Sequence, residues 1–176
     1  MVTLVAMAVT PAVAFAQPRE LPGDDADWGA RPRVSASIGL FTPTGEIGAE
    51  YTQPLTPGFE VGVGVGAGLT GAQFAAMPRL RFGRGPFAIT LGVGVSGGPF
   101  RPNFCLGEDP CMDGQVDALW INGEVGGQIT SRAGLAFRVF GGVGAVAATV
   151  RCTAGTCGSI DGQVLPFLGV SLGHTF

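Results

Sequence analysis

The sequence predicts an all-β protein, an eight-stranded antiparallel up-and-down transmembrane β-barrel. Three observations predict it: short segments alternate apolar with small or polar residues, tight turns alternate with longer connections, and the composition disfavours long helices. Of 176 residues, 31 are Gly, 46% are hydrophobic and only 13% are charged. Long soluble helices need more charged residues and less Gly. The length suits a single domain.

Each predicted strand has one apolar face, because successive side chains of a strand point to opposite sides. The alternation is clearest in the third and fifth segments, where Val, Ile, Leu and Phe oppose Gly and Thr. The predicted strands are Val34–Phe41, Gly45–Gln53, Phe59–Leu69, Ala72–Gly83, Phe87–Ser96, Ala118–Thr130, Leu135–Val150 and the terminal segment 164–176. An even number of strands of about ten residues suits a bilayer crossed at a tilt.

The predicted connections also alternate in length. Residues 54–58, 84–86 and 131–134 are tight turns rich in Gly and Pro, whereas 97–117 and 151–163 are long. Membrane barrels have short turns on one side and longer loops on the other. We therefore expect the tight turns and both termini at one end of the barrel, and the long loops at the other.

Aromatic residues give an independent indication of a membrane barrel. Six of them have the parity of the apolar face, meaning that they occupy the same alternate positions along the strand as its apolar side chains. They fall at the tight-turn end of their segments: Tyr51, Phe59, Phe82, Phe87, Phe137 and Phe176. A ring of outward aromatic side chains is typical of a membrane interface. We expect these residues to form such a girdle.

Charged residues within the predicted strands have the opposite, inward parity. The expected lumen network comprises Glu46, Glu50, Glu60, Glu124, Arg79, Arg81 and Arg138. Because an eight-stranded barrel is just wide enough to be filled by side chains, these charges must pair or be hydrated. The favoured interpretation is a polar plug of Glu–Arg pairs. A narrow ion path stays open as an alternative, since inward glycines such as Gly64 and Gly92 leave room for water.

The N-terminus carries the pattern of a secretory signal. Residues 1–16 are apolar and end in Ala14-Phe15-Ala16, a small-x-small cleavage site, although no Lys or Arg precedes the apolar run. The expected organisation is a signal peptide over 1–16, a flexible polar segment over 17–33 and the barrel domain over 34–176.

With these segments, the chain resembles the small eight-stranded outer-membrane barrels of Gram-negative bacteria, and its end on Phe176 is similar to their closing strand. The resemblance implies a location in the outer membrane, the lipid as a partner, a periplasmic tight-turn end, and recognition of the C-terminal strand by the assembly machinery. Pro78 and Pro166 depart from the pattern, because proline removes a ladder hydrogen bond and can mark a bulge.

The cysteines lie in the two predicted long loops, Cys105 and Cys111 in one, Cys152 and Cys157 in the other. A secreted chain with an even number of cysteines favours disulfides, and the local pairings are the favoured ones among three. The spacing and the lack of a nearby His disfavour zinc. The acidic residues Glu108, Asp109, Asp113 and Asp117 match no EF-hand spacing, so a solvated loop is favoured over a Ca²⁺ site.

No catalytic motif or cofactor site is recognisable, so we expect a protein that is not an enzyme and binds no cofactor or metal. His174, the single His, has outward parity, whereas Ser171 faces the other way. The net charge of −3 argues against nucleic acid as a partner. Three functions stay open, in order of preference: a monomeric structural or surface-interaction barrel, a narrow porin-like channel, and a soluble secreted barrel for an apolar ligand.

Overall fold

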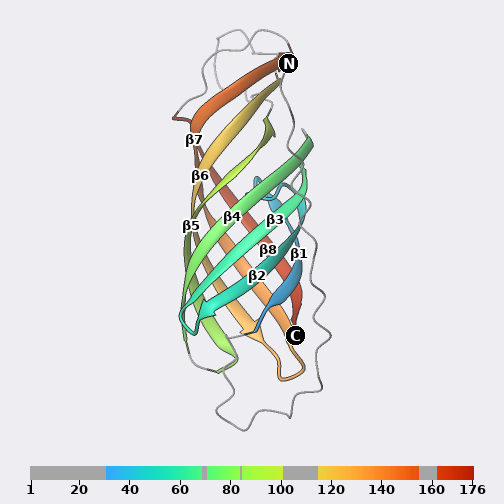
Figure 1. The fold of residues 1–176 in the computed structure, drawn as a ribbon, viewed down its shortest axis with the longest axis vertical. Helices are drawn as coiled ribbons and strands as arrows, with labels where there is room; N and C mark the ends of the chain where they lie inside the picture. Colours follow the sequence, from blue (N-terminus) through green and yellow to red (C-terminus); the bar gives the residue numbers. More distant parts are fainter. Residues whose placement is uncertain (1–30, 69–70, 84, 101–114, 155–161) are drawn as a thin grey trace.

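A computed structural model describes residues 31–68, 71–83, 85–100, 115–154 and 162–176. The described chain is all-β and forms one closed antiparallel barrel in which each strand pairs with its neighbours in sequence and β8 pairs with β1 (Figure 1). The strands are β1 (Arg33–Leu40), β2 (Ile47–Thr56), β3 (Phe59–Gly68), β4 (Gly71–Phe82), β5 (Phe87–Phe100), β6 (Gln115–Thr130), β7 (Leu135–Ala154) and β8 (Val164–Thr175). The predicted fold class of an eight-stranded up-and-down barrel is confirmed. Within the described residues, no helix is long and apolar enough to cross a membrane.

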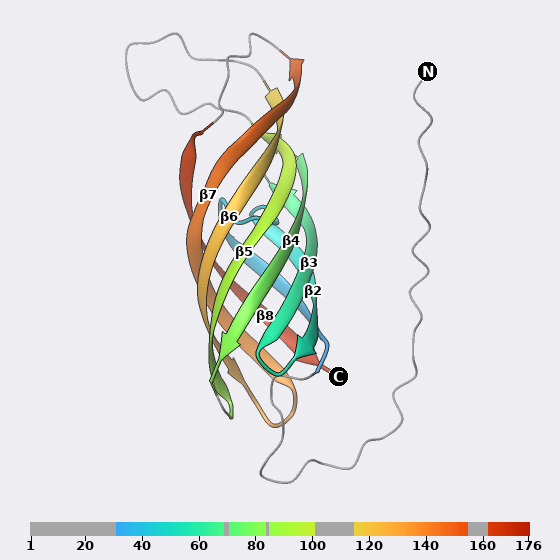
Figure 2. The ribbon, with the colours of Figure 1, turned by 60° about the vertical axis from the view of Figure 1, so that its left-hand side comes forward.

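The two ends of the barrel differ. At the turn end, where β1 begins and β8 ends, short connections join β2 to β3, β4 to β5 and β6 to β7. The opposite, loop end is uneven: β6 and β7 have 16 and 20 residues, against 8 to 14 in the other strands (Figure 2). These two strands therefore extend beyond the rest of the barrel.

Most strand bounds agree with the alternation to within a few residues, but two corrections concern β1 and β2. Arg33, assigned above to the flexible segment, begins β1 and is only 6% exposed. Glu46, assigned above to a strand, lies before β2 in the β1–β2 connection. That connection leaves the strand pattern because Phe41 and Gly45 adopt positive φ angles of 54° and 88°.

The ends of β5, β6 and β7 also continue past the predicted segments. The sequence pattern predicts a loop at Gly97, Gly98 and Pro99, because Gly and Pro usually end a strand. In the barrel, all three pair with β6. The β6–β7 register shifts at three places near the loop end, and such irregularities erase the alternation from which a strand is predicted.

The two prolines flagged in the sequence cause no change of register. Pro166 pairs with Val143 within a continuous β7–β8 ladder. Pro78 pairs with Val61 of β3, while the pairing of β4 with β5 is interrupted between Ala76 and Arg79 and resumes in the same register. The interruption follows from the missing N–H of proline.

Side chains divide sharply between the two faces of the barrel wall. Large apolar residues point outward from every strand; examples are Ile38, Ile47, Val65, Leu80, Val93, Ile121, Phe137 and Leu168. The interior holds buried polar and charged side chains, among them Arg79 at 2% and Glu60 at 3% exposed. This is the reverse of a soluble globular protein, in which the apolar side chains are the buried ones.

Candidate functional site: the barrel interior

The centre of the interior is a network of four charged side chains, here called the central network: Glu50, Arg79, Glu124 and Arg138. They come from β2, β4, β6 and β7, so the network joins four of the eight strands across the lumen. Inward parity places each side chain in the lumen, and barrel closure brings residues far apart in sequence together.

Arg79 is the hub of the central network. Its Nη1 and Nη2 donate to Glu50 Oε1 and Oε2, both at 2.7 Å, and its Nε donates to Glu124 Oε1 at 2.8 Å. This bidentate geometry is the strong form of an Arg–carboxylate pair. Arg138 forms a second ion pair with Glu124, and its guanidinium carbon lies 4.8 Å from the centroid of the Phe140 ring. Two arginines thus balance two carboxylates.

A second cluster, the turn-end network, lies around Arg33. Arg33 Nη1 donates to Gln128 Oε1 at 2.7 Å, and Nη2 lies 3.4 Å from Glu60 Oε1. Thr52 connects the two networks, since its hydroxyl accepts from Arg33 Nη2 at 3.2 Å and donates to Glu50 Oε1 at 3.0 Å. A continuous chain of polar contacts therefore runs from the turn end to the middle of the barrel.

The structure brings six of the seven predicted lumen residues into the interior: Glu50, Glu60, Glu124, Arg79, Arg81 and Arg138. The seventh, Glu46, lies at the loop end, in the β1–β2 connection, with its carboxylate on the inward side of Gly68. Sequence reasoning missed Arg33 as a lumen residue. The signal was present, since Arg33 shares the parity of the inward Ser35 and Ser37.

The lumen is polar only in part. Towards the loop end, buried apolar side chains line it: Ala75, Met77, Phe140, Phe167, Val116, Ala118 and Val146. Phe100 and Trp120 pack against the last three, with their rings edge to face at 5.2 Å. The inner face therefore changes from charged at the centre to largely apolar near the loop end. Inward parity does not require polarity, because side chains inside a closed barrel can bury each other.

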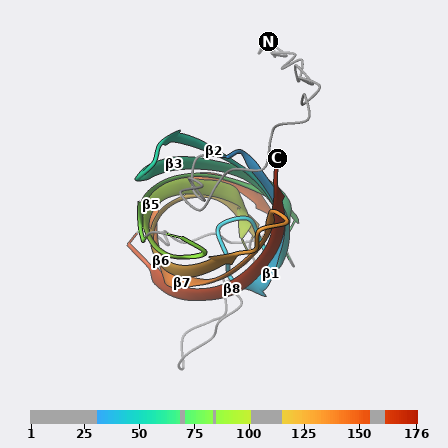
Figure 3. The ribbon, with the colours of Figure 1, turned by 90° about the horizontal axis from the view of Figure 1, so that it is seen from below.

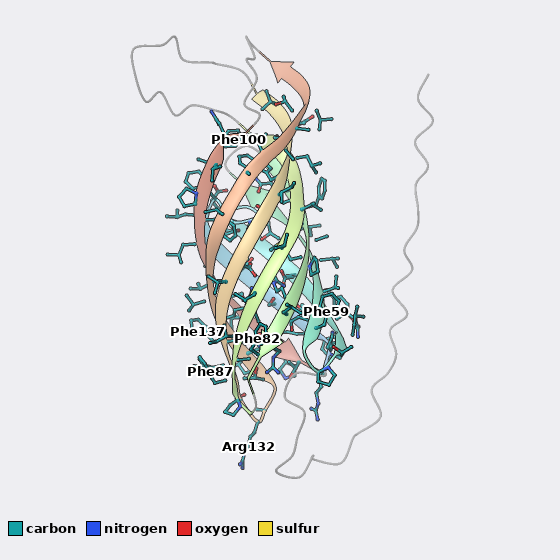
Figure 4. The ribbon with its side chains drawn as sticks, turned by 90° about the vertical axis from the view of Figure 1, so that its left-hand side faces the viewer. Phe59, Phe82, Phe87, Phe100, Arg132 and Phe137 are labelled. Atoms are coloured by element: carbon teal, nitrogen blue, oxygen red, sulfur yellow. The ribbon has the colours of Figure 1, made fainter. Side chains whose placement is uncertain are left out.

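The predicted aromatic girdle lies on the outside, at the turn end. Tyr51, Phe82, Phe87, Phe137 and Phe176 are 38 to 57% exposed, and Phe59 is half-buried. Figure 4 shows the labelled Phe59, Phe82, Phe87 and Phe137 in the lower part of the barrel, towards the turn that carries Arg132. His174 is exposed beside them, and Ser171 faces the interior, so the two side chains point to opposite faces.

Other sequence expectations fall wholly or partly outside the described residues. These are the signal sequence over 1–16, most of the segment 17–33, Cys105, Cys111, Cys157 and the side chain of Cys152, together with Glu108, Asp109 and Asp113. The disulfide pairing stays a prediction. Among the described residues, no group of three or more His, Cys, Asp or Glu side chains is placed to hold a metal ion.

Comparison of the chain with protein-family models, with curated proteins and with solved structures found no match.

Proposed function

We propose that the chain is a non-enzymatic outer-membrane β-barrel protein with a closed, charge-paired interior and a structural or surface-interaction role at its loop end. One observation carries the proposal: apolar side chains cover the outside of the barrel, while the buried charges pair inside. An exterior of this kind is stable in lipid, where the backbone hydrogen bonds of a closed barrel are also satisfied.

The size of the apolar exterior supports lipid over water as its surroundings. Apolar side chains from all eight strands are exposed, including Val34, Ile47, Val63, Leu80, Leu91, Val125, Val139 and Val170. A monomeric soluble protein rarely exposes a continuous apolar patch beyond a few hundred Å². The outward aromatic residues at the turn end match an interfacial girdle. A soluble barrel for an apolar ligand would need the opposite distribution of side chains.

The filled interior supports a structural role over conduction. At the central network, Arg79, Glu124 and Arg138 are each 6% exposed or less, and ion pairs join them across the lumen. A rigid, plugged barrel holds the long connections 101–114 and 155–163 at one end. These connections, with the expected local disulfides, are the proposed surface for contacts with envelope components or the exterior.

Fractionation of expressing cells tests the membrane proposal. We expect the mature protein in the outer membrane, extracted only by detergent, and migrating faster on SDS gels before boiling than after. Recovery of folded protein from the soluble periplasm would refute the proposal. Binding of the purified protein to cell-envelope fractions, compared with a variant whose 101–114 connection is replaced by a short Gly-Ser linker, tests the surface role. Equal binding by the two proteins would refute that role.

A narrow ion channel is the second candidate. A cavity of about 20 Å³ next to the central network is the observation in its favour. Conductance across planar bilayers separates the two functions, because a permanently plugged barrel gives no current above the lipid baseline.

A further inference from the structure

The β1–β2 connection, residues 41–46, turns into the barrel instead of leaving it. Thr42 and Thr44 are 2% and 5% exposed, and Pro43 and Gly45 are buried as well. Figure 3, viewed along the barrel, shows the blue-to-cyan chain between β1 and β2 inside the ring of strands. Residues 41–46 are called the plug segment below.

The wall around the plug segment is shaped to receive it by inward glycines. A Cβ atom added to Gly48 would lie 2.5 Å from Thr44 Oγ1, and one added to Gly64 would lie 2.6 Å from Thr44 Cγ2. On β8, the other neighbour of β1, a Cβ at Gly169 would lie 2.9 Å from Thr42 Cγ2. Such separations are too short for real contacts. The inward glycines therefore hold space for the plug segment rather than for water.

The backbone of the plug segment is strained at Phe41. Phe41 is the one non-glycine residue in the described chain with a positive φ, 54°. The left-handed region is unfavourable for L-residues other than Gly and, to a lesser extent, Asn and Asp. The Phe41 side chain is 47% exposed, so burial of its own ring does not offset the strain. Withdrawal of the plug segment would release it.

Between Thr42 and Gly45 the plug segment bonds to itself: Gly45 N donates to Thr42 O at 2.8 Å, and the Thr42 hydroxyl donates to Gly45 O. Its hydrogen bonds to the wall include Gly39 N donating to Glu46 O at 3.0 Å, at the end of the segment, and the contact between the hydroxyls of Thr44 and Ser37 at 3.4 Å. Strained residues held mainly by packing are typical of elements with two states.

A cavity lined by both polar residues and the apolar Ala75, Met77 and Phe140 lies next to the plug segment. Its volume is about 20 Å³, enough for a water molecule. Pro43 and Thr44 form one side, the central network forms another, and Ser35, Ser37 and Ser171 contribute to the lining. Arg138 is one of the lining residues, and its buried Nε, which lies beside Gly126, has no hydrogen-bond acceptor in the structure.

We propose that the plug segment is a reversible cover: when it withdraws, the cavity becomes a pocket, open at the loop end, that admits small hydrophilic solutes down to the central network. The inference goes beyond the structural role proposed above and does not depend on it, because the plug and the cavity belong to the barrel itself. It also differs from conduction, since the central network still closes the lumen below the pocket.

Thiol labelling of Ser171→Cys tests the proposal. The folded variant in detergent is treated with a small cationic methanethiosulfonate reagent, and labelling of the native cysteines, measured on the parent protein, is subtracted. Phe41→Asn and Phe41→Val are then introduced separately into Ser171→Cys. Both change a residue whose side chain lies outside the lumen, but Asn tolerates positive φ and the β-branched Val does not. Gly127→Ala is the control, since a Cβ there meets nothing within 4 Å.

Relief of strain at Phe41 should slow labelling about fivefold in Phe41→Asn, whereas Phe41→Val should speed it by a similar factor and Gly127→Ala should leave it unchanged. The Asn variant keeps the test informative if the Val variant does not fold. Equal rates in the variants and their parent, as expected if the reagent enters from the turn end, would overturn the proposal. An unreactive thiol at position 171 in every folded variant would overturn it too.

Discussion

Loss of the Arg79 guanidinium is expected to destabilise the barrel more than loss of any other charge in the central network. Arg79→Met keeps much of the side-chain volume but removes the three hydrogen bonds to Glu50 and Glu124. Glu50 then loses its ion pair with residue 79 and retains the hydrogen bond that the Thr52 hydroxyl donates to it at 3.0 Å. Breaking a buried pair in this way costs about 3–5 kcal/mol, because an uncompensated charge is left behind.

Arg138→Met provides the comparison. Glu124 loses one partner but keeps Arg79 Nε at 2.8 Å, so a smaller loss of about 1.5–3 kcal/mol is expected, the range for a hydrogen bond to a charged group. Arg132→Met at the exposed β6–β7 turn is the surface control; because exposed charge contacts contribute about 0–1 kcal/mol, it should change stability by no more than about 1 kcal/mol.

The assay is guanidinium-induced unfolding of the folded protein in detergent, followed by tryptophan fluorescence and by the loss of heat-modifiable migration. Adding Glu50→Gln to Arg79→Met should restore part of the lost stability, with a coupling energy of about 0.5–3 kcal/mol. A loss in Arg79→Met no larger than in Arg138→Met, or a double variant no more stable than the single one, would refute the assignment of Arg79 as the hub.

Three further perturbations test other parts of the structure. Leu91→Arg places a charge on the apolar exterior of β5 and should cost about 2–4 kcal/mol in lipid; wild-type stability of this variant would show that the exterior does not face the membrane core. Gly48→Ala should destabilise the barrel by about 1–3 kcal/mol through a clash with Thr44, and Thr44→Gly should relieve it, whereas Gly127→Ala should be neutral. Deletion of Phe176 should lower the amount of folded protein in the outer membrane, as measured by fractionation; an unchanged amount would argue against recognition of the chain end.

The sequence by itself determined the fold class and the faces of the strands. Period-two alternation is a local property: whether Leu91 or Thr90 points outward follows from its position in one strand. The alternation is visible in the sequence because the outward residues are apolar and most inward residues are small or polar. Gly- and Pro-rich turns mark where the strands end. Six of the seven predicted lumen charges could be placed for that reason.

The tertiary structure decided what depends on barrel closure. Which carboxylates Arg79 contacts cannot be derived from one strand, because Glu50 and Glu124 reach it from positions 29 and 45 residues away. The inward course of the β1–β2 connection could not be predicted from the sequence either. The space beside the inward Gly48, Gly64 and Gly66 could hold water or a peptide segment, and the sequence does not distinguish the two. Near the loop end, irregular β6–β7 pairing removed the alternation on which strand prediction depends. Parity assigns a side chain to a face, but only the closed barrel assigns its neighbours across the lumen.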